Sequence, residues 1–181
     1  MKRRRFLSSV AIILPATMVS TEFFLSSCKA EVKEGYFSEE NIKLLDEIGE
    51  TIIPATSTSP GAKAAKIGGF MKVYVTDCYT PEEQNIFWQG VNKIKKISKD
   101  KYGNEFPKLA LLQKQEILLS LNSENKINTD TPQFYPMMKN LVVFGFFTSK
   151  PGATKALRYI QTPGYYKGNV PYKKGDKAWA T

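Results

Sequence analysis

The sequence contains no histidine and only two cysteines, Cys28 and Cys78. Without histidine the chain has no Ser-His-Asp triad, no Cys-His pair, no histidine-ligated zinc or iron and no CxxCH attachment site for haem. No glycine-rich fingerprint for a dinucleotide or phosphate follows a predicted strand either, because Gly61 follows a loop and Gly68-Gly69 lie in a predicted helix. These absences argue against an enzyme that works alone.

Acidic residues are also in the minority. The chain has 26 Lys and Arg against 17 Asp and Glu, a net charge of +9 over 181 residues. Such an excess suits a protein that faces an acidic partner or an anionic surface, and by itself does not indicate nucleic acid. The length predicts one domain whose core needs neither a disulfide nor a metal ion.

Residues 1–27 are predicted to be an export signal. A basic start, Lys2–Arg5, precedes a short apolar stretch at 10–14, and Leu25–Cys28 fits the lipobox, in which the cysteine receives diacylglycerol. Polar residues interrupt the apolar stretch, so a membrane-spanning helix is not predicted. An ordinary secretory signal with a coincidental cysteine is the alternative. We expect an exported protein of the periplasm or cell envelope, anchored to a membrane through lipid on Cys28.

The leader also resembles a twin-arginine signal. Arg3 and Arg4, followed by Phe6 and Leu7, match the core of signals that export proteins already folded, often together with a cofactor-bearing partner. The residues on either side of this motif depart from the usual pattern. A basic start also serves general secretion, so the sequence leaves both routes open.

The remainder is predicted to be all-α, with a short polar tether at 28–37 and one compact domain of about five helices at 38–181. Ser38 is the predicted N-cap of a helix that Pro54 ends. Thr80–Glu83 combines an N-cap threonine, a first-turn proline and a glutamate three residues after the cap, which together predict a helix to about residue 101. Apolar periodicity predicts further helices at about 62–78, 109–121, 131–147 and 153–159.

Three features within these helices carry expectations of their own. Gly68-Gly69 suggests the close approach of a neighbouring backbone. Cys78 has no base beside it and is expected to be a buried structural thiol. The lysines at 93–101 are expected to form a solvated helix face rather than a docking site. Phe70 and Tyr74 lie at the apolar spacing of the helix predicted at 62–78, and the helix predicted at 131–147 is rich in apolar residues that include Phe144 and Phe147.

Glycine, proline and tyrosine dominate from Ile160 onward, so we expect a long irregular coil and no strand. Because interfaces favour tyrosine and tryptophan, the aromatic residues here are a candidate partner interface; the alternative is that they cover the domain's own core. The candidate residues are Tyr159, Pro163, Gly164, Tyr165, Tyr166, Tyr172 and Trp179.

Several short motifs, in order, resemble the gluconate 2-dehydrogenase subunit 3 family over about residues 36–172. They are Glu50–Thr56 with Pro60–Ala62, Tyr102-Gly103 with Phe106, Phe146–Ser149 with Gly152, and Tyr159 with Pro163–Tyr165 and Gly168. A departure lies at Gly68-Gly69, where many relatives carry histidine or a bulkier residue.

The resemblance implies a non-catalytic small subunit of a membrane-associated, FAD-dependent dehydrogenase of the glucose–methanol–choline type, acting on sugars or sugar acids. The FAD and the substrate would be bound by a large flavoprotein subunit, and a cytochrome c subunit carrying haem c would take the electrons onward. This chain would hold no catalytic, cofactor or metal residues. It would support maturation and export of the flavoprotein, and the lipid on Cys28 would anchor the complex.

A stand-alone, lipid-anchored lipoprotein that binds a sugar or another solute is the alternative, because tyrosine and tryptophan stack on sugar faces. A nucleic-acid role is excluded by the expected compartment.

Overall fold

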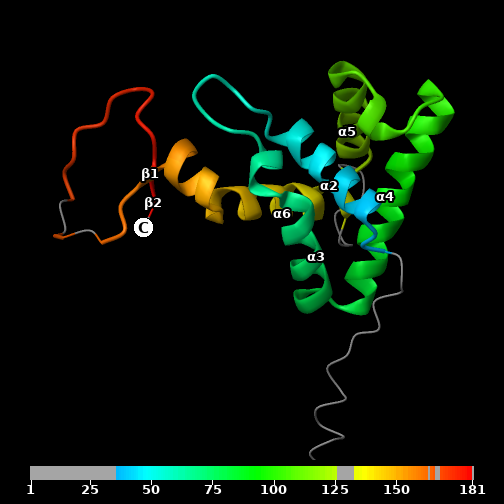
Figure 1. Ribbon diagram of the computed structural model, residues 1–181, viewed down its shortest axis with the longest axis horizontal. Coiled ribbons are helices and arrows are strands. Elements are labelled where there is room, and N and C mark those ends of the chain that lie inside the picture. The colour runs from blue at the N-terminus through cyan, green and yellow to red at the C-terminus, as the bar shows by residue number, and fades with distance from the viewer. Residues whose placement is uncertain (1–35, 126–132, 163, 166–167, 181) are drawn as a thin grey trace, which may run out of the picture. The chain divides into compact units, whose positions relative to one another are not determined.

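The computed structural model describes residues 36–125, 133–162, 164–165 and 168–180. The predicted export signal, the predicted lipobox with Cys28 and most of the predicted tether lie outside the described residues. Within them the chain is a compact helical domain with one two-stranded sheet, which confirms the all-α prediction (Figure 1). No helix in the described ranges is long and apolar enough to span a bilayer.

Two of the described helices, α2 (Glu39–Ile52) and α4 (Pro81–Tyr102), begin and end where their capping residues predict. α2 starts at Ser38, whose Oγ accepts a hydrogen bond from the Asn41 amide at 3.3 Å. α4 starts with a reciprocal capping box between Thr80 and Glu83 and ends at Gly103, whose φ of 67° lies in the left-handed region. These caps confirm the predicted boundaries because they depend on local sequence alone.

The start of α3 (Ile67–Cys78) depends on a residue from another helix. A 3₁₀ turn, η1 (Ala62–Ala65), precedes it, and Lys66 at its N-cap has φ 52° and no capping side chain. Asp46 of α2 supplies the missing acceptor, because its Oδ1 receives the Gly68 amide at 2.8 Å. A Cβ at Gly68 would lie 2.3 Å from the Ile42 carbonyl oxygen, so the predicted close approach is confirmed there.

α6 (Phe134–Thr148) packs against four helices, namely α2, α3, α4 and α5 (Leu111–Asn125). Figure 1 shows α6, in yellow, running across the other helices. A 3₁₀ turn, η2 (Phe106–Lys108), joins α4 to α5. The core that these elements enclose includes the fully buried side chains of Ile48, Met71, Phe87, Ile94, Phe106, Ile117, Met138 and Phe146. Burial of each such side chain contributes about 1.5–3 kcal/mol to folding.

The chain after α6 differs from the prediction. A π-helical turn, η3 (Gly152–Ala156), replaces the expected helix at 153–159, and the next residues form β1 (Arg158–Tyr159). β1 pairs in parallel with β2 (Trp179–Ala180), through Arg158 N to Ala178 O at 2.8 Å and Ile160 N to Ala180 O at 2.9 Å. The expectation of no strand is therefore wrong, because the coil folds back to pair with its own beginning.

Candidate partner interface

The loop that carries the motif Glu50–Thr56 is held by its own side chains. The Glu50 carboxylate accepts hydrogen bonds from the backbone amides of Ala55 at 3.0 Å and Lys63 at 2.8 Å, which lie on either side of the loop. Inside the loop, Thr56 Oγ1 accepts from the Ser59 amide at 3.0 Å. The polar side chains of the motif thus stabilise the turn between α2 and η1. Glu50 and Thr56 have a structural role there, because both accept backbone amides of the loop.

Glu47, one turn before Glu50, forms ion pairs that connect α2 with η1 and α5. Its carboxylate pairs with Lys63 and also with Lys114 of α5, at 3.1 Å from the Lys114 Nζ. Partial burial acts to raise the pKa of Glu47, but the hydrogen bonds and charges of the two lysines outweigh it and hold the pKa below its ordinary value. The arrangement stabilises the packing of α2 against η1 and α5.

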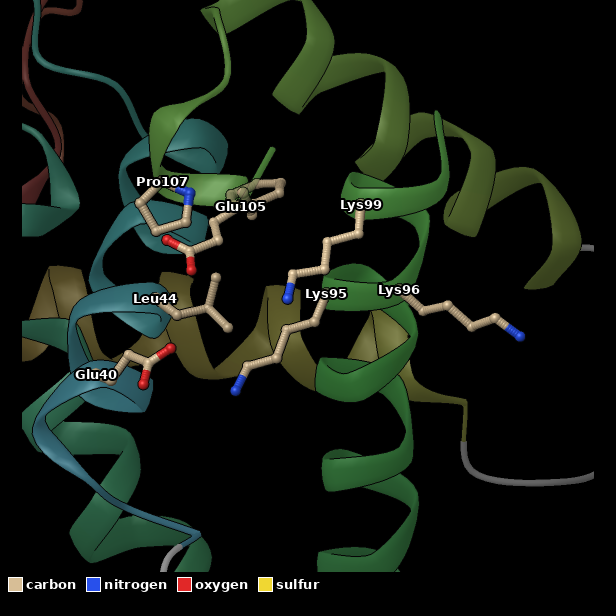
Figure 2. A pocket seen from close by; sticks show the side chains of 8 residues that line it. Glu40, Leu44, Lys95, Lys96, Lys99, Glu105 and Pro107 are labelled. Atoms are coloured by element: carbon tan, nitrogen blue, oxygen red, sulfur yellow. The ribbon is translucent and has the colours of Figure 1, made fainter. Parts of the chain in front are cut away.

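The lysine-rich part of α4 lines a pocket of about 290 Å³ between α4, α2 and η2. Figure 2 shows Lys95 and Lys99 pointing toward Glu40 and Glu105, while Lys96 points away from them. Lys95 is half-buried and donates to Asn41 Oδ1 at 2.5 Å, so the expected fully solvated face is wrong at this residue.

Charge in this pocket is nearly balanced. The hydrogen bond from Lys108, at 3.0 Å, and the charges of Lys108, Lys99 and Lys95 hold the pKa of Glu105 below its ordinary value. Glu40 and Glu105 are thus carboxylates facing two lysines, which leaves little excess charge to attract an ion. We therefore assign no ligand to this pocket.

The C-terminal loop, residues 157–180, presents the aromatic residues singled out in the sequence. Its four described aromatic candidates are exposed, with 46% of Tyr159, 80% of Tyr165, 77% of Tyr172 and 51% of Trp179 accessible to solvent. This exposure contradicts the alternative in which they cover the core. Gly164 is exposed as well, and Pro163 and Tyr166 lie outside the described residues. Contact of these residues with a partner stays a prediction.

The fold brings some of these residues together. The Arg158 guanidinium lies 4.5 Å from the centre of the Trp179 ring, and both line an open hollow with Tyr172. In the parallel ladder of β1 with β2, Arg158 pairs with Trp179 and Tyr159 pairs with Ala180. The fold therefore brings Tyr172 and Trp179 together with Arg158, while Tyr159 is not among the residues of the hollow.

A second aromatic surface was missed by sequence reasoning. We call it the α3–α6 face, and it consists of Phe70, Val73, Tyr74, Val143, Phe144 and Phe147. Val73 is 60% exposed and Phe144 52%, so part of the apolar surface of these two helices lies outside the core. The signal was present, because Leu141–Phe147 is apolar around the whole helix and one helix cannot bury every side.

The rings of the α3–α6 face interlock. The centre of the Phe144 ring lies 5.9 Å from the ring centres of both Phe70 and Tyr74, and those two ring centres are 5.6 Å apart. Phe70 rests on Gly145 of α6, where a Cβ would come within 2.5 Å of the ring. Glycine at 145 thus lets the two helices approach and fixes the Phe70 ring.

The end of α3 continues this apolar surface. Tyr79 meets Tyr74 edge-on at 5.7 Å, and burial raises the pKa of Tyr79 to about 12, so its phenol is neutral near pH 7. Cys78, the last residue of α3, is exposed, and the expectation of a buried thiol is wrong. Its side chain lies on the outer side of the helix end, which helical periodicity alone did not reveal.

The described part of the chain contains no group of His, Cys, Asp or Glu residues arranged to hold a metal ion.

Comparison with known proteins gives one match. The family model for gluconate 2-dehydrogenase subunit 3 matches residues 39–164, from the start of α2 into the C-terminal loop. No curated protein sequence and no solved structure matches the chain.

Proposed function

The chain belongs to the gluconate 2-dehydrogenase subunit 3 family, and from this premise we propose that it is the non-catalytic small subunit of a membrane-associated, FAD-dependent dehydrogenase of sugars or sugar acids. Membership makes it an accessory subunit of a dehydrogenase complex with a larger catalytic partner. The match over residues 39–164, which spans every α-helix described above, is the observation that carries the proposal.

The chemistry of the complex is assigned to the partner. The large subunit, of the glucose–methanol–choline type, binds FAD and removes hydride from the substrate, and a cytochrome c subunit passes the electrons on. The residue inventory supports this division, since the chain has no histidine and the polar side chains of its family motif hold a loop. This chain's residues bind and position the partner.

The leader supplies the proposed export and anchoring. Arg3 and Arg4 with Phe6 and Leu7 direct the folded pair through the twin-arginine route, and lipid on Cys28 holds the complex at the membrane. Binding before export also makes the subunit a maturation factor, because only a folded flavoprotein then carries a signal. The motifs in the sequence support these assignments.

Two surfaces are available for the partner, the C-terminal loop and the α3–α6 face. Tyrosine and tryptophan provide large contact areas at little cost in conformational entropy, which suits Tyr165, Tyr172 and Trp179 to an interface.

The hollow between Arg158, Tyr172 and Trp179 favours one alternative, a lipoprotein that binds sugars by itself. Calorimetry of the purified chain with sugars distinguishes the two functions. Saturable heat in the absence of any partner supports the alternative, and a flat trace removes it.

The direct test is purification of the full chain, tagged at its C-terminus, from native membranes in mild detergent. We expect a co-purifying large subunit, a flavin absorption band and sugar-dependent reduction of a dye. A Cys28→Ser variant serves as the control for anchoring, and the same complex should then appear in the soluble fraction. A colourless single chain, recovered while a flavoprotein is expressed beside it, would contradict the proposal.

A further inference from the structure

The α3–α6 face is preformed. Its rings are fixed by one another and by the seat of Phe70 on Gly145, as described above. A rigid surface loses little conformational entropy on binding, and contiguous exposed apolar residues mark interaction sites on soluble domains. The face therefore has the properties of one half of an interface.

Gly69, one helical turn before Val73, adds a second observation. Nothing lies within 4 Å of the position that its Cβ would occupy, and its φ is not in the left-handed region. Glycine inside a helix costs about 1 kcal/mol relative to alanine. Neither packing within the described chain nor its backbone requires this glycine, in contrast to Gly68, which faces the Ile42 carbonyl. An open glycine beside exposed rings lets another backbone come close from outside.

Positive charge surrounds the face. Lys72 follows Gly69 by three residues on α3, and Lys139 precedes Val143 by four on α6. Lys66 is at the N-cap of α3, and Lys150 follows the C-cap of α6. All four lysines are exposed, and none forms an ion pair with any residue that the structure describes. Asp77, four residues after Val73, is an acidic exception. A complementary surface is apolar at its centre and acidic at its edge.

The family match points to the same face. Both α3 and α6 lie inside residues 39–164, whereas Tyr165, Tyr172 and Trp179 follow them. A partner shared by a family of subunits is expected to bind the part of the chain that defines the family.

We propose that the α3–α6 face, with Gly69 and its lysine border, docks the larger catalytic subunit, which presents an apolar surface edged with aspartate and glutamate. This rests on the proposed function and adds to it the site of contact and the chemistry of the partner's surface. A backbone segment of the partner lies against Gly69, and Val73 and Phe144 contact its apolar centre.

The test uses the full tagged chain co-expressed with the flavoprotein, and the flavin absorbance recovered per tagged chain is measured. Gly69→Gln places a polar side chain in the open space beside Gly69, and Val73→Glu places a negative charge against the apolar centre of the partner's surface. Each should lower the recovered flavin by about tenfold or more, as for residues at the centre of an interface. Leu112→Glu on α5, where the native leucine is 78% exposed, is the matched control and should recover flavin at the unsubstituted level.

Thermal unfolding of each variant separates docking from folding. Glutamine is a better helix former than glycine, so Gly69→Gln should melt at the same temperature as the unsubstituted chain or higher. Gly68→Gln should melt lower, because of the Ile42 carbonyl. A variant that is at least as stable and yet loses the flavoprotein supports the inference.

The outcomes are distinguishable. If the unsubstituted chain recovers no flavoprotein, the proposed function fails and the inference with it. If it recovers flavoprotein and Gly69→Gln and Val73→Glu recover as much, the inference is overturned while the function stands. A change from dimer to monomer in these variants at constant flavin recovery would also overturn it, in favour of a second copy of this chain.

Discussion

The helical body, residues 39–156, and the C-terminal loop use aromatic residues in opposite ways. In the body, Phe87, Phe106 and Phe146 are almost fully buried. In the loop, Tyr165 and Tyr172 are mostly exposed, and a ladder of two residues per strand closes the loop at β1 and β2. Figure 1 shows this loop, in orange and red, leaving the end of η3. Burial of aromatic side chains therefore stabilises the body, whereas the aromatic surface of the loop is available for binding.

The α3–α6 face belongs structurally to the body but resembles the loop in its exposure. Val73 and Phe144 are on helices that the core holds rigid, so the face is ordered without a partner. The loop has few buried contacts and is expected to open locally before the body unfolds. Four predictions sharpen this division, from the largest effect on stability to the smallest.

Phe87→Ala should lower the free energy of unfolding by about 3–5 kcal/mol, because it leaves a cavity in the core. Phe87 is fully buried, and its ring lies 5.4 Å from that of Trp88 and 6.1 Å from that of Phe134. Urea unfolding followed by circular dichroism measures the change. Leu112→Ala is the control and should stay within about 0.5 kcal/mol. Equal losses for both variants would contradict the division.

Glu50→Ala should cost about 1–2 kcal/mol, because it removes the acceptor of two backbone amides around the 54–61 loop. Glu50→Gln keeps one acceptor oxygen and should lose about half as much. The same unfolding measurement applies, and proteolysis within 54–61 should rise in the alanine variant. An alanine variant as stable and protease-resistant as the unsubstituted chain would show that the loop holds without Glu50.

Glu47→Gln should cost up to about 1 kcal/mol at pH 7, a small amount because water screens much of the pair. The pKa of Glu47 is lower in the folded chain than its ordinary value of 4.5. A lowered pKa stabilises the fold above that ordinary value, and the contribution is lost as pH falls through the folded pKa.

Unfolding of both chains between pH 7 and pH 3 provides the measurement. The difference between them should be constant above about pH 4.5 and shrink below it. Other carboxylates with lowered pKa values, such as Glu105 and Glu116, are present in both chains and cancel. A difference that is independent of pH would exclude the ion pair as its source.

Trp179→Ala should change the stability of the body by less than about 0.5 kcal/mol, because the ring is half-exposed and contacts Arg158 within the loop. The chain has two tryptophans, and the other, Trp88, is 2% exposed. Fluorescence emission should therefore shift to shorter wavelength in the variant, while amide exchange at Ile160 speeds up. A loss of several kcal/mol would mean that the loop supports the core.

Sequence reasoning succeeded wherever the determinants are local. The caps at Ser38 and Thr80 and the stop at Gly103 follow from residues within a few positions of each site. The family motifs were also readable in order, and the family match confirms the resemblance that they indicated.

It failed where distant segments decide the outcome. Periodicity showed that α3 and α6 are apolar but not which of their sides a neighbour covers. The exposed Cys78 was therefore expected to be buried, and the exposure of Phe144 was not foreseen. The pairing of Arg158 with Trp179 joins residues too far apart for any local pattern to predict.

The sequence by itself determined the helical class, the main boundaries and the family, because hydrogen bonds at caps and turns are made by near neighbours in the chain. The tertiary structure alone decided that Asp46 caps α3, that Gly69 is open while Gly68 is closed, and that an aromatic face remains uncovered. The physical reason is burial, since a side chain is inside or outside only by virtue of what packs over it.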